Sequence, residues 1–235
     1  MTKTKIEKNK FNIKTEEMIV AGLHLGHRTS RVHPKMKPYL SGVKNTVHII
    51  DMEKTAEKLE EALKFIQELI LEKKTLLFIG TRVQAKELVK SFAIENSLPY
   101  INERWLGGTF TNFEIIKKRL FYFKDLEKKR KEGDLEKYTK KERFKIDQEL
   151  CRLEIKFGGI KEMEKLPEAV FVLDMKKDHL AVKEARMKGI KVIAIADTNV
   201  DPTLADYPIP ANDDAIQSIS YILEKVKEVI KNAKL

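Results

Sequence analysis

Cysteine and tryptophan are almost absent from this chain, which has one of each among its 235 residues. A lone cysteine, Cys151, can form neither an internal disulfide nor a cysteine-rich metal site, and this is typical of a reducing compartment. No apolar run approaches the ~18 residues that a membrane-spanning helix requires. The N-terminal residues are charged and polar and lack the apolar core of a secretory signal. We therefore expect a soluble intracellular protein.

Glycine-rich phosphate-binding loops are also missing. Neither G-x-G-x-x-G nor G-K-[ST] occurs in the sequence, so a dinucleotide or P-loop site is not supported. No constellation of serine or cysteine with a histidine suggests a nucleophilic enzyme, and Cys151 is interpreted as a packing residue. We expect neither a cofactor nor a metal.

Acidic residues are missing from one long stretch, residues 22–50, which we call the basic segment. It contains five cations, three glycines and two prolines. The cations are Arg28, Arg31, Lys35, Lys37 and Lys44. Prolines and glycines at these spacings interrupt a helix or a central strand, so we expect an extended loop that presents its cations to a polyanion. The alternative is a solvated surface loop, which is less favoured because a restricted backbone loses less entropy on binding.

The positive charge is concentrated in two parts of the chain. The whole protein has 46 lysines and arginines against 36 acidic residues, a formal net charge of +10. Residues 1–54 carry a net +6 and residues 112–165 a net +5, whereas 55–111 are neutral and 166–235 carry −1. Such concentration indicates a docking face rather than charge for solubility alone. Residues 1–14 are expected to form a flexible basic tail.

Short apolar runs alternate with helical patterns along most of the chain. Strands are expected at 47–50, 75–80, 100–102, 169–174, 191–197 and 207–209. Continuous apolar strands between helices indicate a parallel sheet covered on both faces. We expect an α/β fold with a flavodoxin-like, doubly wound and mostly parallel sheet of about five strands. Helix starts are expected at Asp51, Thr81, Asp178 and Asn212, with Gly189 ending the third of these helices.

Residues 112–157 interrupt this alternation with two highly charged helical patterns. Each pattern has one narrow apolar seam: Ile116, Leu120 and Phe123 in the first, and Ile146, Leu150, Leu153 and Phe157 in the second. Gly133 lies between them, and T-K-K-E at 139–142 has the form of a capping box. The pattern predicts an antiparallel coiled-coil hairpin that projects from the body, which comprises 15–111 and 158–235.

The sequence N-E-R-W-L-G-G-T-F-T-N joins the body to this hairpin. Trp105 is expected to anchor the root of the hairpin, and the paired glycines after it permit a tight turn. The same stretch offers donors to RNA phosphates or sugars: Arg104, Thr109, Thr111 and Asn112.

His24 and His27 suggest an alternative, a metal site with Asp197, Asp213 and Asp214 as candidate carboxylate ligands at the carboxyl edge of the sheet. The pattern lacks a third histidine, and H-x-x-H is common by chance. Hydrogen bonds from these histidines to backbone or phosphate are therefore the favoured interpretation. Asp213 and Asp214 are interpreted as first-turn residues of the last helix, where carboxylates interact favourably with the helix dipole.

Seven motifs together resemble the ribosomal protein S2 family of bacterial and organellar type. They are A-G-L-H-L-G-H-R-T-S, P-K-M-K-P-Y, H-I-I-D, R-W-L-G-G-T-F-T-N, F-G-G-I-K-E-M, D-T-N-V-D-P and Y-P-I-P-A-N-D-D-A-I, in the family's order between residues 21 and 216. Leu25, His33 and Ala211 depart from residues usual in the family. At Ala211 glycine is common, which puts a positive φ there in doubt.

The resemblance implies a non-enzymatic structural constituent of the small ribosomal subunit. The implied partners are small-subunit (16S-type) rRNA and neighbouring small-subunit proteins, including ribosomal protein S1, with no membrane. The implied location is the ribosome of a bacterial cytoplasm, or of an organellar matrix or stroma. On this basis the expected RNA-binding residues are His27, Arg28, Arg31, Lys35, Lys37, Lys44, Arg104, Thr109 and Asn112. The alternatives are a metal- or nucleotide-dependent hydrolase that uses His24, His27 and Asp197, and a free protein-interaction adaptor that uses the hairpin.

Overall fold

The computed structural model describes residues 11–234 and contains a five-stranded parallel sheet. Its strands are β4 (Leu76–Ile79), β5 (Tyr100–Ile101), β6 (Ala169–Val172), β7 (Lys191–Ala196) and β8 (Tyr207–Pro210), in the order β5-β4-β6-β7-β8. This is the strand order of flavodoxin-like doubly wound sheets. The predicted fold class is therefore confirmed. Most of the predicted tail lies outside the described residues, and Phe11 and Ile13 pack against the core.

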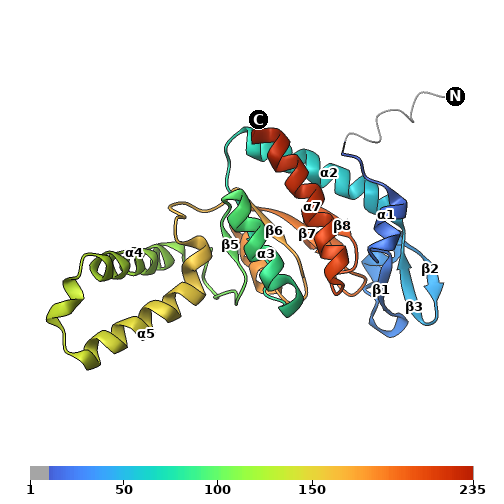
Figure 1. The fold of residues 1–235 in the computed structure, drawn as a ribbon. Coiled ribbons are helices and arrows are strands. Elements are labelled where there is room, and N and C mark those ends of the chain that lie inside the picture. Colours follow the sequence, from blue (N-terminus) through green and yellow to red (C-terminus); the bar gives the residue numbers. More distant parts are fainter. Residues whose placement is uncertain (1–10, 235) are drawn as a thin grey trace.

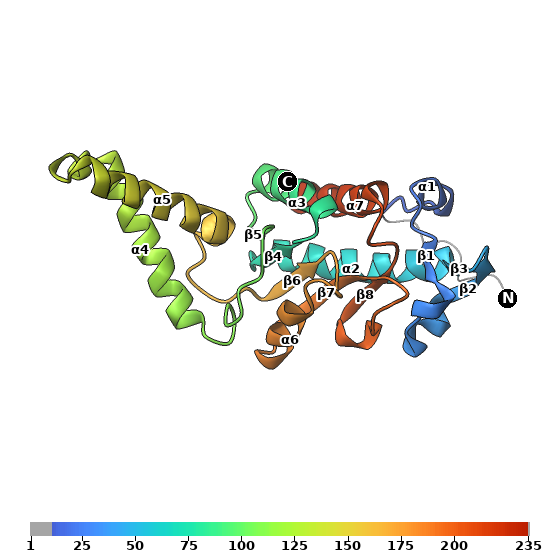
Figure 2. The same cartoon turned by 90° about the horizontal axis from the view of Figure 1, so that it is seen from below.

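Helices cover both faces of this sheet (Figures 1 and 2). One face is covered by α2 (Met52–Leu71), α3 (Val83–Asn96) and α7 (Ile216–Lys234), with the short α1 (Thr15–Val20) beside α2; the other carries α6 (His179–Met187). Strand side chains alternate between the two cores, as the pleat requires: Phe78 packs with α2 and α3, and Leu77 with α6. Both are fully buried, which explains why the strands read as continuous apolar runs.

The basic segment forms a second, antiparallel sheet rather than the extended loop that its composition predicts. Its strands are β1 (Leu25–Arg28), β2 (Leu40–Lys44) and β3 (Val47–Ile50), in the order β1-β3-β2, and two 3-10 helices (Thr29–Arg31 and Pro34–Tyr39) connect β1 to β2. Both prolines lie in the second 3-10 helix, and Gly42 follows an irregularity in an edge strand. The residues that break regular structure are thus confined to connections and edges. The prediction of a loop was wrong for β1 and β2, whereas the strand predicted at 47–50 is confirmed as β3.

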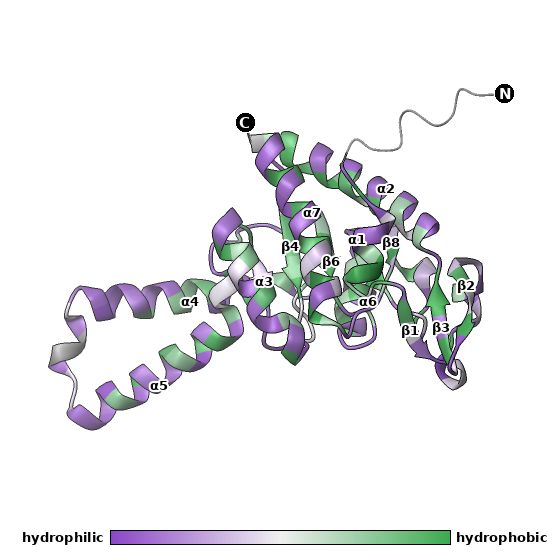
Figure 3. Ribbon diagram, turned by 45° about the vertical axis from the view of Figure 1, so that its right-hand side comes forward, coloured by the Kyte–Doolittle hydropathy of each residue, from purple (hydrophilic) through white to green (hydrophobic). Residues whose placement is uncertain are grey.

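The hairpin consists of α4 (Phe113–Lys131) and α5 (Lys140–Phe157), joined through a short 3-10 helix (Asp134–Lys137), and it extends away from the body (Figure 1). The predicted seams face each other and are buried, apart from Ile146, which is partly buried. The seam residues belong to the same apolar cluster as the α6 face of the sheet, so the hairpin core continues into the body. Figure 3 shows the strands of the body as hydrophobic and much of α4 as hydrophilic.

The observed helix boundaries confirm some of the predicted capping residues and contradict others. Asp51 caps α2 by accepting a hydrogen bond from the Glu53 amide at 3.1 Å, and T-K-K-E forms a complete capping box. Gly189 follows α6 with a φ of 71°. Thr81 does not open α3, because its hydroxyl donates to Asp178, and α7 begins at Ile216 rather than at residue 212. Ala211 does not have a positive φ. Within residues 11–234 no helix combines the length and the apolar character needed to span a membrane.

Candidate nucleic-acid interface

The five cations of the basic segment are all exposed, on the small sheet and its connections. Four of them have no carboxylate within ion-pair distance among the described residues: Arg28, Arg31, Lys37 and Lys44. They follow one another through β1, both 3-10 helices and β2. Exposed cations that no acid of the described residues neutralises are the part of a surface that attracts a polyanion.

Lys35 differs from these four because it is bound within the protein. Its Nζ donates to Asp201 Oδ2 at 2.7 Å and to Thr203 Oγ1 at 3.0 Å. Although burial opposes the shift, hydrogen bonds from Lys35 and Thr203 lower the pKa of Asp201 to about 2. The pair fastens the basic segment to the loop between β7 and β8.

Thr198, in the same loop, holds the segment at two further points. The His27 amide donates to Thr198 Oγ1 at 2.9 Å, and the His33 amide donates to the Thr198 carbonyl at 2.7 Å. The Asn212 amide also donates to the Leu23 carbonyl at 3.1 Å. The motifs D-T-N-V-D-P and Y-P-I-P-A-N-D-D-A-I therefore position the basic segment on the body.

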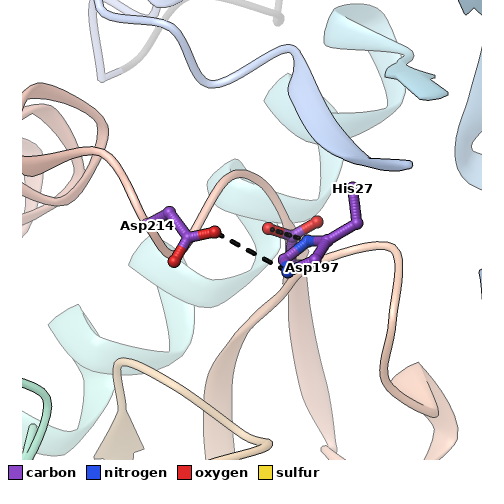
Figure 4. A group of neighbouring side chains, drawn as sticks. All are labelled: His27, Asp197 and Asp214. Atoms are coloured by element: carbon purple, nitrogen blue, oxygen red, sulfur yellow. Dashed lines mark ion pairs between the residues drawn. The ribbon is translucent and has the colours of Figure 1, made fainter. Parts of the chain in front are cut away.

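The His27 ring lies between carboxylates at the junction of the two sheets (Figure 4). Its Nδ1 is 3.1 Å from Asp197 Oδ2, its Nε2 is 3.6 Å from Asp214 Oδ2, and its Nε2 is 2.9 Å from the Asn199 side-chain nitrogen. The hydrogen bond to Asp197 raises the pKa of His27 despite its burial, and the charges of the surrounding acids add to the effect. The ring is only 15% exposed, so its main contacts are with the protein.

Three of the five candidate metal ligands named from the sequence come together here. Ligand-type atoms of His27, Asp197 and Asp214 lie within 4.8 Å of one another, a spacing that one divalent cation could bridge. His24 is not part of the group, and its Nδ1 is buried without a hydrogen-bond partner among the described residues. All three members of the group were among the candidate ligands named from the sequence, whereas His24 and Asp213, which were also named, lie outside it.

Arg82 occupies the point where the strand order reverses, at the carboxyl ends of β4 and β6. Its guanidinium lies 3.0 Å from Asp174, 2.8 Å from Asp213 and 2.7 Å from Asp214. In doubly wound folds this crevice is the usual ligand site. Burial, and then the charges of Asp174 and Asp197, raise the pKa of Asp213 to about 8, although Arg82 acts in the opposite direction. The Arg82 side chain thus lies in the crevice where other doubly wound folds bind a ligand.

The other predicted RNA-binding residues lie at the root of the hairpin. Arg104 and Asn112 are exposed, and the side chain of Asn112 does not cap α4. Thr109 is only 3% exposed, and its hydroxyl donates to the Leu106 carbonyl at 2.6 Å. Its hydroxyl is thus already engaged within the protein. Trp105 anchors the root as predicted, with its ring edge-on to Phe110.

Glu184 is the central residue of this root, and the sequence did not reveal it. Its Oε1 accepts from Trp105 Nε1 at 3.2 Å and from the Gly108 amide at 2.8 Å, and its Oε2 accepts from the amides of Phe110 at 2.9 Å and Thr111 at 3.2 Å. Burial alone would raise the pKa of Glu184, but these donors outweigh it and hold the pKa below its usual range. In the sequence, Glu184 resembles any charged residue of a surface helix. The one available signal was the buried indole N–H, which needs an acceptor.

The predicted residues therefore fall into two groups at opposite ends of the body. The basic segment lies next to β8, and the hairpin root lies next to β5; these are the two edge strands of the parallel sheet (Figure 1). A cationic segment at one end of a folded body and polar donors at the other can contact two places on one large ligand, which a small substrate cannot offer.

Comparison with known proteins identifies the family. The model of the family "Ribosomal protein S2" matches residues 18–233. The chain belongs to the ribosomal protein S2 family. It is 47% identical over 212 residues to the small ribosomal subunit protein uS2 of Chloroflexus aurantiacus, covering 90% of this chain and 89% of the relative. It is 45% identical to uS2 of Chlorobium chlorochromatii over 95% of this chain and 89% of the relative, and 43% identical to uS2 of Coprothermobacter proteolyticus over 92% and 80%.

Membership in the S2 family makes the chain a component of the small ribosomal subunit, and confirms the resemblance that the seven motifs predicted. The family is structural rather than enzymatic, and neither the family match nor the relatives support the hydrolase alternative.

Proposed function

We propose that this S2 protein binds small-subunit rRNA mainly through the basic segment, with the hairpin and its root as a second contact. The observation that carries the proposal is the set of exposed cations without an acidic partner, on a sheet held firmly to the body. These cations neutralise phosphates, which positions the protein without reading a base sequence. Specificity then comes from the fit of the two regions to folded RNA.

The two regions differ in how their charge is arranged. Acids lie among the hairpin cations and pair with some of them, as Asp125 does with Lys129 at 2.6 Å and Asp147 with Arg130 at 3.5 Å. Such exposed pairs reduce the charge that remains for a phosphate. The basic segment contains no acid at all, so we assign the stronger contact to it.

Phosphate contacts are proposed for Arg28, Arg31, Lys37 and Lys44, and donors from the root for Arg104 and Asn112. The contacts described above assign a different role to three of the predicted residues. Lys35 and His27 fasten the segment to the body, and Thr109 shapes the root. Neighbouring small-subunit proteins, including ribosomal protein S1, are proposed as further partners.

Charge reversal in the basic segment tests the proposal. Arg28→Glu with Lys37→Glu changes two exposed residues that have no ion pair within the described part of the chain, so the fold should survive while entry into the subunit falls. The matched control is Lys90→Glu with Lys231→Glu, which makes the same charge change on exposed faces of α3 and α7. Sedimentation of the tagged chain in a sucrose gradient measures the fraction that travels with the small subunit. Equal incorporation of both double variants would contradict the proposal.

A further inference from the structure

A groove runs between α6 and the loop that follows β7, on the face of the body opposite α2 and α7. Its volume is about 600 Å³, within the range of binding sites for small molecules and short segments. Most of its lining is apolar. The floor includes Met175, Val182 and Val200, all at most 9% exposed, and the outer wall includes Leu204 and Met187, which are 42% and 64% exposed. The groove thus presents apolar side chains that no part of residues 11–234 covers.

The rim of this α6 groove is cationic. Lys176, Lys183 and Arg186 line it and are exposed. Lys176 and Lys183 have no carboxylate partner among the residues that the structure describes, and Arg186 donates to the Thr203 carbonyl at 3.3 Å. The one acid of the lining, Asp201, is neutralised by Lys35. The rim therefore carries a net positive charge around an apolar floor.

These two properties decide the chemistry of the occupant. Single-stranded RNA binds by stacking bases on aromatic rings, and the lining residues offer only the small imidazole rings of His33 and His179, with no phenylalanine, tyrosine or tryptophan. An apolar floor inside a charged rim instead suits an amphipathic protein segment with apolar side chains on one face and carboxylates on its borders. The chain's own N-terminal residues do not fit, because residues 1–10 contain four lysines and a single glutamate.

We infer that the α6 groove is a docking site for an acidic amphipathic segment of a neighbouring protein in the small subunit. The inference rests on the proposed function, because that function supplies such neighbours. It goes further in naming the surface and the chemistry of the partner. The groove borders the basic segment at His33, but its lining contains none of the four unpaired cations of that segment, so those cations stay available to RNA when the groove is occupied.

Fluorescence anisotropy with the full-length protein tests the groove directly. The probe is a labelled synthetic helix with leucines on one face and glutamates on the other, and the reference probes are the same helix with lysine for glutamate and a labelled oligouridylate. Lys183→Glu with Met187→Glu changes two exposed residues one helical turn apart on the wall of the groove. The control is Lys188→Glu, an exposed residue just beyond the end of α6 and outside the groove.

The acidic helix is expected to bind, and the double variant to weaken its binding about ten-fold or more, a change of about 1.4 kcal/mol. The Lys188→Glu variant should bind the acidic helix as tightly as the parent protein does, and binding of the lysine helix to the parent protein gives the background level. Equal binding of the acidic and lysine helices, or equal loss in the control, would overturn the inference. Loss of oligouridylate binding in the double variant alone would assign the groove to RNA and overturn it as well.

A photoreactive residue in place of Met187 extends the test to the assembled subunit. The expected product is a crosslink to a ribosomal protein segment rich in acidic and apolar residues, identified by mass spectrometry. A crosslink to rRNA alone, or none, would contradict the inference while leaving the proposed function intact. Failure of the proposed function is seen separately, as unchanged incorporation when Arg28 and Lys37 are reversed.

Discussion

Gly26 and Thr198 are in direct contact where the small sheet meets the body. A Cβ atom on Gly26 would stand 2.4 Å from Thr198 Cγ2 and 3.1 Å from the His48 carbonyl oxygen. Real Cβ atoms do not approach other atoms so closely, so only glycine lets β1 lie against the β7–β8 loop. The same threonine receives the His27 amide and provides the carbonyl for His33. One close approach thus sets the position of the whole basic segment.

We expect Gly26→Ala to separate the small sheet from the body. Overpacking at a rigid contact costs about 1–3 kcal/mol, so the free energy of unfolding should fall by that amount. Gly42→Ala is the control, because Gly42 is in the same sheet and a Cβ there meets nothing within 4 Å. Chemical denaturation of both variants measures the difference. If the two variants are equally stable, the contact does not fix the segment.

Glu184→Gln should loosen the root of the hairpin while changing no atom's position by much. In the parent protein both carboxylate oxygens accept hydrogen bonds from N–H groups of the root. Glutamine replaces one of these oxygens by an NH2 group, which cannot accept them, so about 2–3 kcal/mol of stability should be lost. Glu224→Gln, on an exposed position of α7, should cost almost nothing. Limited proteolysis at the hairpin root, together with denaturation, distinguishes local loosening from global loss. A root as resistant as that of the parent protein would contradict the role assigned to Glu184.

The same carboxylate predicts a dependence of stability on pH. The folded state holds the pKa of Glu184 below its unfolded value of about 4.3. The stabilisation is therefore complete above that unfolded pKa and is lost as the pH falls through the lower, folded pKa. Glu184→Gln should remove this part of the acid dependence, so the curves of stability against pH for the parent and the variant should converge in acid. Parallel curves would show that other groups account for the acid sensitivity.

Arg82→Met should destabilise the carboxyl edge of the sheet. The guanidinium contacts Asp174, Asp213 and Asp214, and its removal leaves three acidic groups facing one another, of which only Asp214 keeps a basic neighbour, His27, in the described structure. Removing one partner of a largely buried pair costs about 3–5 kcal/mol, and the partial exposure of Arg82 favours the lower end. Arg143→Met, at an exposed position of α5, is the control in thermal unfolding. Equal melting temperatures for the two variants would mean that water stabilises these acidic groups as well as the Arg82 guanidinium does.

The parallel sheet could be predicted because its signal is local. Strands such as Leu76–Ile79 are apolar throughout, since both faces are buried, and the helices between them have regular apolar faces. Of the small sheet, only β3 could be predicted in this way. Strands β1 and β2 contain glycine and are largely exposed, and the pairing of β2 with β3 depends on a turn at Asn45 and Thr46 in which both residues have positive φ, at 49° and 64°.

Among the site residues, too, those whose role depends on local sequence could be predicted, and those whose role depends on distant partners could not. The exposure of Arg28 and Lys37 follows from their charge, so the sequence was sufficient for the outward face. The roles of Glu184, Thr109 and Lys35 depend on partners that lie far away in the chain or on a turn that closes over them. Lys35 is bound to a residue 166 positions away, and no pattern within the basic segment distinguishes it from Lys37.

Lys35 and Lys37 therefore offer a test within a single 3-10 helix. Lys37→Ala should remove one phosphate contact, so the slope of log affinity for rRNA against log salt should shrink by about 0.7–0.9. Lys35→Ala should leave that slope nearly unchanged, because the ammonium of Lys35 is already bound to Asp201. It should instead raise the pKa of Asp201 from about 2 towards that of a free aspartate, which a carboxyl titration by NMR would detect. Equal changes in slope for the two variants would show that Lys35 leaves Asp201 to bind phosphate when RNA is present.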